Sequence, residues 1–147
     1  MTTYCAVTRE DTQSLGKRLA DSLRAGDVLL LSGRMGAGKS EFARGVARGL
    51  GVTSAVPSPS FTILNVYDEG RLPLYHFDWY RIGDESEITD MGLEEYIGGD
   101  GVCLIEWHER AEDLLPDTCL EVLLSPQEDG ARIITLMPHG QWEAQHR

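Results

Sequence analysis

The chain has 147 residues, of which 41% are hydrophobic, and its formal net charge at pH 7 is −11. This length suits one globular domain with its own core and excludes a second domain of similar size. Because no apolar run approaches the roughly 20 residues of a membrane span and the first residues lack a signal-peptide pattern, we expect a cytoplasmic protein with no membrane partner.

The first elements predicted along the chain are a short strand and an amphipathic helix. Residues 4–7 favour a strand, and either Asp11 or Thr12 is expected to cap the helix that follows. Gly26 is expected to end this helix. Its apolar residues recur at i, i+4 and i+8 and are Leu15, Leu19 and Leu23.

The next stretch matches the phosphate-binding motif G-x-x-x-x-G-K-[ST], the P-loop. An apolar strand over residues 27–32 precedes it and a helix over residues 40–50 follows it, which is the context that the motif requires. In such a loop, backbone N–H groups and the positive end of the helix dipole face a polyphosphate. We therefore expect nucleotide binding, with the Lys39 ammonium at the β- and γ-phosphates and the Ser40 hydroxyl as a ligand of Mg²⁺. The residues expected to hold the nucleotide are Gly33, Arg34, Met35, Gly36, Ala37, Gly38, Lys39, Ser40 and Glu41.

Residues 56–61 contain two prolines and two serines, a composition typical of an extended loop. In nucleotide switches a loop hydroxyl contacts the Mg²⁺ or the terminal phosphate and releases it after hydrolysis. Ser58 and Ser60 are candidates for this role, and an ordinary loop is the alternative.

A β-hairpin is predicted from strands at residues 62–67 and 72–77, joined by a turn in which Gly70 is expected to be left-handed. Asp78 follows the second strand directly, so its carboxylate is a candidate to hold Mg²⁺ or to position an attacking water. Six of the eleven aromatic residues fall between residues 61 and 80. Core packing is expected for most of them, and a partner surface for the rest.

A short acidic helical region is predicted from residue 84 to the glycines at 98 and 99. The strongly apolar strand at residues 102–105 then ends in Glu106. A carboxylate at the tip of a buried strand beside a P-loop strand is the usual partner of Mg²⁺, either directly or through water. Asp78 and Glu106 therefore compete for this role.

A second antiparallel hairpin is predicted from residues 118–124 and 131–137. Residues 138–147 are expected to form a flexible tail, so that the single domain comprises residues 1–137. The cysteines are set among apolar residues, which favours buried thiols, and the four histidines show no metal-ligand spacing. The three cysteines are Cys5, Cys103 and Cys119.

Charge is unevenly distributed along the chain. Residues 1–50 carry eight Arg or Lys against five Asp or Glu, and residues 51–147 carry five against nineteen. An acidic surface repels a nucleic-acid backbone, so tight direct binding of RNA or DNA is not expected. The alternative is that the acids only form a solvated surface.

Two other classes of P-loop protein fit the sequence less well. A GTPase recognises guanine through an Asn-Lys-x-Asp element, but the only lysines are Lys17 and Lys39, which excludes GTP specificity of that type. A small-molecule kinase closes an arginine-bearing lid over the phosphoryl group. The arginines after the P-loop helix are scattered, which weakens the kinase interpretation without eliminating it.

Four motifs in this order resemble the TsaE (YjeE) family of small bacterial ATPases, over roughly residues 12 to 124. They are the P-loop, Ser58-Pro59-Ser60-Phe61, His76-Phe77-Asp78-Trp79-Tyr80-Arg81 and Ile105-Glu106-Trp107. The resemblance implies an α/β fold of the P-loop NTPase type, with three layers and a parallel core sheet flanked by antiparallel strands and helices.

The resemblance also implies an ATP-hydrolysing accessory protein. Its role would be in forming N6-threonylcarbamoyladenosine at position 37 of tRNAs that read codons beginning with A. Its partners would be the proteins TsaD and TsaB, with tRNA contacted only indirectly through their complex. The implied cofactors are ATP and Mg²⁺. A small-molecule kinase and a nucleotide-binding scaffold that does not hydrolyse remain the alternatives.

Motif by motif, the resemblance gives Lys39 and Ser40 to the phosphates and Mg²⁺, Glu106 to the Mg²⁺ side, and Asp78 to hydrolysis. Trp107 would flank the site. The chain departs from the usual family pattern at several positions. Glu41 is the departure with the clearest consequence, since an acid near the phosphates lowers the expected nucleotide affinity. The others are Arg34, Ser40, Ser60 and His108.

Overall fold

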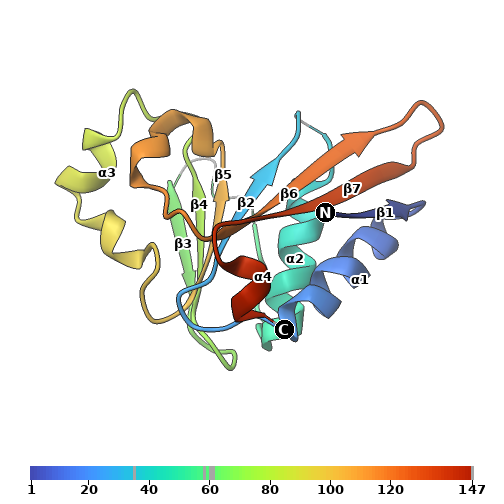
Figure 1. The fold of residues 1–147 in the computed structure, drawn as a ribbon, viewed down its shortest axis with the longest axis horizontal. Helices are drawn as coiled ribbons and strands as arrows, with labels where there is room; N and C mark the ends of the chain where they lie inside the picture. The colour runs from blue at the N-terminus through green and yellow to red at the C-terminus, as the bar shows by residue number, and fades with distance from the viewer. Residues whose placement is uncertain (35, 58, 60–61, 147) are drawn as a thin grey trace.

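The computed structural model describes residues 1–34, 36–57, 59 and 62–146, and in these residues seven strands form one mixed sheet (Figure 1). The strands are β1 (Thr2–Ala6), β2 (Val28–Ser32), β3 (Leu64–Tyr67), β4 (Leu74–Asp78), β5 (Val102–Glu106), β6 (Cys119–Pro126) and β7 (Arg132–His139). Their order across the sheet is β1-β7-β6-β2-β5-β4-β3.

The centre of the sheet is parallel and both of its edges are antiparallel. Strand β2 lies between β5 and β6 and is parallel to both, and β4 is parallel to β5. Strands β3, β7 and β1 run antiparallel to their neighbours. The predicted α/β fold with a parallel core is therefore confirmed. Because the carboxyl ends of β2, β4 and β5 share one edge, the P-loop, Asp78 and Glu106 meet there.

Helical segments cover both faces of the sheet, on opposite sides of the central strands in Figure 1. The helices α1 (Arg9–Ala20) and α2 (Lys39–Leu50) pack on one face against Leu29 and Leu31 of β2. The other face packs Val28 and Leu30 against the segment that contains α3 (Ser86–Asp90), η1 (Leu93–Tyr96) and η2 (His108–Leu114). Strand β2 is apolar on both faces because it is buried on both.

Helices α1 and α2 approach each other closely. A Cβ atom added to Gly45 would lie 2.1 Å from the carbonyl oxygen of Gln13, so only glycine fits at this crossing. The predicted apolar face of α2 is buried, and Gly51 caps the helix in a left-handed conformation, as expected from its position just beyond the last apolar residue.

The predicted cap of α1 was wrong by one turn. Thr8 is the N-cap: its hydroxyl accepts a hydrogen bond from the backbone N–H of Asp11 at 3.1 Å, and the Asp11 carboxylate accepts one from the N–H of Thr8 at 3.1 Å. The backbone N–H groups of Thr8 and Asp11, which have no partner within the helix, are thereby hydrogen-bonded. The helix also ends earlier than expected, at Ala20 rather than at Gly26, although Leu23 stays buried.

The β3–β4 hairpin is present, but Gly70 is required there for a different structural reason than predicted. Gly70 does not lie in the left-handed region. A Cβ atom there would instead lie 2.2 Å from the carbonyl oxygen of Leu50, so the turn packs against the end of α2. The β6–β7 hairpin is also present, and its Gly130 does have a positive φ of 87°.

The C-terminal segment is folded, contrary to the expected loose tail. Helix α4 (Trp142–Gln145) buries Trp142 in the hydrophobic cluster on the face of the sheet that α1 and α2 cover. The ring of His146 stacks on that of Trp142 at 3.9 Å, and its Nε2 lies 2.7 Å from Oδ2 of Asp27. The folded unit therefore continues through residue 146.

Two smaller expectations are only partly met. Cys103 and Cys119 are buried, and burial raises the pKa of both thiols, but Cys5 is exposed on the edge strand β1. Of the aromatic residues near β4, Phe77 and Trp79 belong to the core, whereas Tyr80 is exposed.

None of the helices in the described part of the chain has the length and hydropathy needed to span a bilayer.

Candidate functional site

A cavity of about 400 Å³ opens at the carboxyl edge of the sheet, in front of the P-loop. Its described lining residues are Arg9, Gly36, Gly38, Lys39, Ser40, Glu41, Asp78, Glu106, Trp107 and Arg132. The structure thus brings together the predicted lysine, the predicted hydroxyl and both candidate carboxylates, which come from three different segments of the chain.

The glycines of the P-loop give the chain its turn. Gly36 has a φ of 79° and Gly38, which precedes the first residue of α2, has a φ of 102°. These are conformations that side chains disfavour. Ala37 is buried in the loop and Arg34 is exposed, whereas Met35 lies outside the described residues. The loop ends where α2 begins, so the positive end of the α2 dipole faces the cavity.

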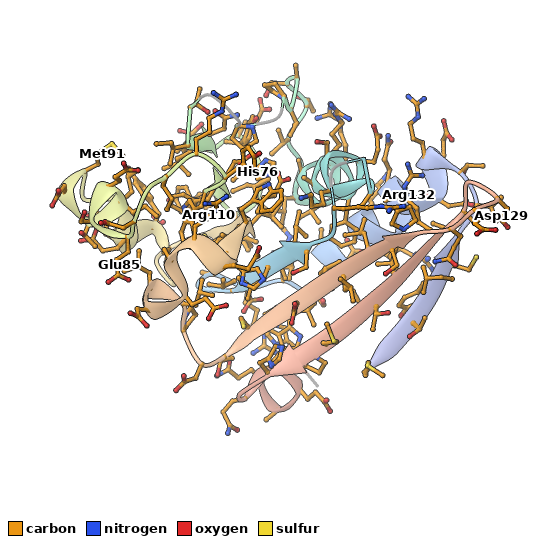
Figure 2. All side chains as sticks on the ribbon, turned by 90° about the horizontal axis from the view of Figure 1, so that it is seen from above. His76, Glu85, Met91, Arg110, Asp129 and Arg132 are labelled. Atoms are coloured by element: carbon orange, nitrogen blue, oxygen red, sulfur yellow. The ribbon has the colours of Figure 1, made fainter. Side chains whose placement is uncertain are left out.

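Arg132 was missed by the sequence interpretation and supports the P-loop from β7. Its Nε donates a hydrogen bond to the carbonyl oxygen of Ala37 at 2.8 Å. Its side chain also occupies the space beside Gly38, where a Cβ atom would lie 2.7 Å from Nε. Figure 2 shows Arg132 beside the helices. In the sequence, Arg132 lies 95 residues after Ala37, the P-loop residue that it contacts. Arg132, Arg9 and Lys39 are the basic residues of the described lining, which also contains the acids Glu41, Asp78 and Glu106.

Lys39 and Trp107 contact each other across the cavity. Lys39 is 8% exposed, and its Nζ lies 4.5 Å from the centroid of the Trp107 ring, within the range of a cation–π contact. Trp107 follows β5 with a φ of 60°, a left-handed conformation that costs a residue with a side chain about 1 kcal/mol. The position of its ring agrees with the flanking role that the resemblance implies.

The two candidate acids end neighbouring strands. Asp78 and Glu106 are partners in the β4–β5 register and are 6% and 4% exposed. Oδ1 of Asp78 accepts a hydrogen bond from the N–H of Tyr80 at 2.9 Å. Glu106 pairs on its other side with Leu31 of β2, which confirms that its strand neighbours the P-loop strand. Asp78 lies one strand farther away.

Glu41, which places an acid near the expected phosphates, has two partners. Its carboxylate accepts hydrogen bonds from Nη1 of Arg44 at 2.7 Å and from Nε2 of Gln13 at 2.5 Å. Arg44 offsets the charge of Glu41, and Gln13 links the carboxylate to α1. These contacts reduce the repulsion that an unpaired acid would exert on a phosphate.

The oxygen donors of the cavity fit Mg²⁺. The Ser40 hydroxyl and the carboxylates of Asp78 and Glu106 line it together with Lys39. Mg²⁺ in nucleotide sites takes one or two carboxylates along with phosphate oxygens rather than a cage made only of protein. The described residues therefore suit a magnesium–polyphosphate ligand.

Some residues of the predicted motifs are not found among the described residues of the cavity. Ser58 and Ser60 lie outside the described residues. Arg81, the last residue of the motif that begins at His76, is exposed and is not among the described lining residues. Arg9 lines the cavity without any signal in the local sequence, because it is brought there by the packing of α1 on α2.

Comparison with known proteins gives consistent results. A family model described as "Threonylcarbamoyl adenosine biosynthesis protein TsaE" matches residues 6–134. A "tRNA threonylcarbamoyladenosine biosynthesis protein TsaE" from Bacillus subtilis (strain 168) is 47% identical over 134 residues, covering 91% of this chain and 84% of that protein. One of the same name from Nostoc sp. is 40% identical over 142 residues, covering 94% and 86%. The crystal structure of Bacillus subtilis YdiB superposes with a TM-score of 0.86 at 39% identity, covering 98% of this chain and 90% of that one.

Proposed function

The chain belongs to the TsaE family of tRNA threonylcarbamoyladenosine biosynthesis proteins, and from this premise we propose that it is a Mg²⁺-dependent ATPase that serves this modification. The modified nucleoside is N6-threonylcarbamoyladenosine at position 37 of tRNAs that read codons beginning with A. In this proposal the chain acts on a complex of TsaB and TsaD and meets tRNA only through that complex.

One observation supports the ATPase proposal above all others. Lys39, Ser40 and two buried carboxylates line a single cavity at the end of the P-loop strand. Phosphoryl transfer needs little more from a protein than positioning and electrostatic stabilisation. This cavity offers both through a fixed lysine, a helix N-terminus and acids held by neighbouring strands.

Different residues of the chain have different roles in binding and in the proposed hydrolysis. The P-loop amides and Lys39 would bind and orient the phosphates, and Ser40 and Glu106 would hold Mg²⁺. Asp78 orients the water that attacks the γ-phosphate. When bound, Mg²⁺ neutralises charge on the β- and γ-phosphate oxygens. The ring of Trp107 lies against Lys39 and shields the part of the cavity around Lys39 from solvent.

The isolated chain is expected to be slow. Arg132 is hydrogen-bonded to the P-loop through its Nε, Arg81 lies outside the described lining, and Arg9 lies in the first turn of α1, so we assign none of the three as an arginine finger. A missing finger leaves the rate about 10³ to 10⁵ below its assisted value. We propose that the complex of TsaB and TsaD supplies the missing interaction. The acidic remainder of the chain, residues 51–147, suits a basic protein surface better than tRNA.

The expected result is therefore a partner-dependent ATPase. Steady-state turnover is measured at low and high salt with the chain alone, with tRNA alone, and with TsaB and TsaD. We expect acceleration only with the two proteins, and weaker acceleration at high salt because the attraction between charged surfaces is screened. Fast turnover by the chain alone, or stimulation by tRNA alone, would contradict the accessory role.

A further inference from the structure

His76 is a deeply buried histidine in contact with one of the candidate acids. It lies on β4, two residues before Asp78, and is 1% exposed. Its Nε2 lies 2.7 Å from Oε2 of Glu106. In the β4–β5 register His76 is opposite Leu104, so Glu106 is its diagonal neighbour on the same face of the sheet. Figure 2 labels His76 among the crowded side chains in the middle of the molecule.

The two nitrogens of His76 are used unequally. A carboxylate only accepts hydrogen bonds, so Nε2 carries the hydrogen and donates it to Glu106. Nδ1 is buried and has no hydrogen-bond partner among the described residues. Buried polar atoms without partners are uncommon in folded proteins. Among the described residues, the contact with Glu106 is therefore the one hydrogen bond of the His76 side chain.

Glu106 reaches the cavity, whereas His76 stays behind it. Glu106 is among the lining residues and His76 is not. A carboxylate has two oxygens, and His76 contacts Oε2. With one oxygen held, the carboxyl group loses rotational freedom and its second oxygen remains available for a ligand.

We propose that His76 is a positioning residue that fixes the carboxylate of Glu106 through Oε2 and leaves Oε1 for Mg²⁺. This inference rests on the proposed function. Partners that hold a metal-ligating group typically change metal affinity about 10- to 100-fold when they are removed. His76 is expected to act in this way on the apparent affinity for Mg²⁺, with little effect on binding of nucleotide without the metal.

The chain contains a matched control for a purely structural effect. His146 and Asp27 form a second buried histidine–carboxylate pair, also with 2.7 Å between Nε2 and Oδ2. Asp27 directly precedes β2 and is thus at the opposite end of this strand from the P-loop. Loss of the His146 pair removes a similar buried contact without touching the cavity.

The test is calorimetric binding of ADP over a range of Mg²⁺ concentrations, together with thermal melts. In His76→Ala, the Mg²⁺ concentration at which the affinity for ADP increases is expected to be about 10- to 100-fold higher than in the wild type. Binding of ADP in EDTA is expected to be unchanged. His76→Gln is expected to restore most of the loss, because its amide N–H is able to donate to Glu106. His146→Ala is expected to melt at a lower temperature and to keep the wild-type Mg²⁺ dependence.

A second variant, His76→Phe, keeps a ring in the space and removes the donor, so the test stands if His76→Ala does not fold. Wild-type Mg²⁺ dependence in His76→Phe or His76→Ala would overturn this inference and leave the proposed function intact. An equal shift in His146→Ala would also overturn it, because the effect would then follow from stability. Failure of the wild-type chain to bind ADP at all would overturn the inference and the proposed function together.

Discussion

Replacing Lys39 by alanine is expected to abolish binding of Mg²⁺-ATP or nearly so. The side chain is held in the cavity beside Trp107, and the only other lysine is Lys17. A hydrogen bond to a charged group contributes about 1.5–3 kcal/mol. Loss of contacts to two phosphates therefore corresponds to a decrease in affinity of about 100-fold or more.

Lys17→Ala is the matched control, because Lys17 is an exposed residue of α1 and is not among the described lining residues of the cavity in front of the P-loop. Titration calorimetry is carried out on the wild type and on both variants, and thermal melts verify that each is folded. Lys17→Ala is expected to bind as the wild type does. Undiminished binding in Lys39→Ala would remove the basis of the nucleotide assignment.

Replacing either candidate acid by its amide is expected to suppress hydrolysis while the fold and nucleotide binding remain. Groups that activate or position a reacting water contribute typically about 10²- to 10⁴-fold. We expect Glu106→Gln and Asp78→Asn each to lower turnover by about 100-fold or more. Glu106→Gln should show the larger change in Mg²⁺ dependence, because β5 pairs directly with the P-loop strand.

Turnover is measured in the presence of TsaB and TsaD as a function of Mg²⁺ concentration, and binding of ATP is measured separately. The two measurements distinguish a chemical defect from a binding defect. A change in Mg²⁺ dependence in Asp78→Asn alone would exchange the roles assigned to the two acids. Full activity in both variants would mean that neither carboxylate takes part in the reaction.

The parts of the site that are local in sequence could be predicted from the sequence. The P-loop is one contiguous strand, loop and helix, and its glycines and lysine have fixed spacing. Asp78 and Glu106 were found because each directly follows a predicted strand, and carboxylates at strand ends are candidates to hold Mg²⁺. The hairpins followed in the same way from alternating apolar residues and turn residues.

The contacts between distant segments could not be predicted in this way. Arg132 and Ala37 are 95 residues apart in the chain, and no periodicity links them. The His76–Glu106 pair depends on the register of two strands, which an apolar pattern leaves open. Helix α4 is too short to have a helical period, and it is held by Trp142 and by a pairing across 119 residues.

Smaller errors have local physical causes. At the start of α1, Thr8 and Asp11 cap each other, so the acid that looked like the cap lies inside the first turn. Gly70 was interpreted through turn conformation, whereas the space beside Leu50 requires it. In the first case a local capping box decides which residue is the cap, and in the second case tertiary packing decides why the position is a glycine.

The fate of the γ-phosphate of ATP tests the central claim most directly. Phosphorus NMR follows Mg²⁺-ATP with the chain alone and with TsaB and TsaD added. We expect inorganic phosphate and ADP to appear in equal amounts, slowly with the chain alone and much faster with the two proteins. Transfer of the phosphoryl group to another compound, or no consumption of ATP under either condition, would contradict this claim.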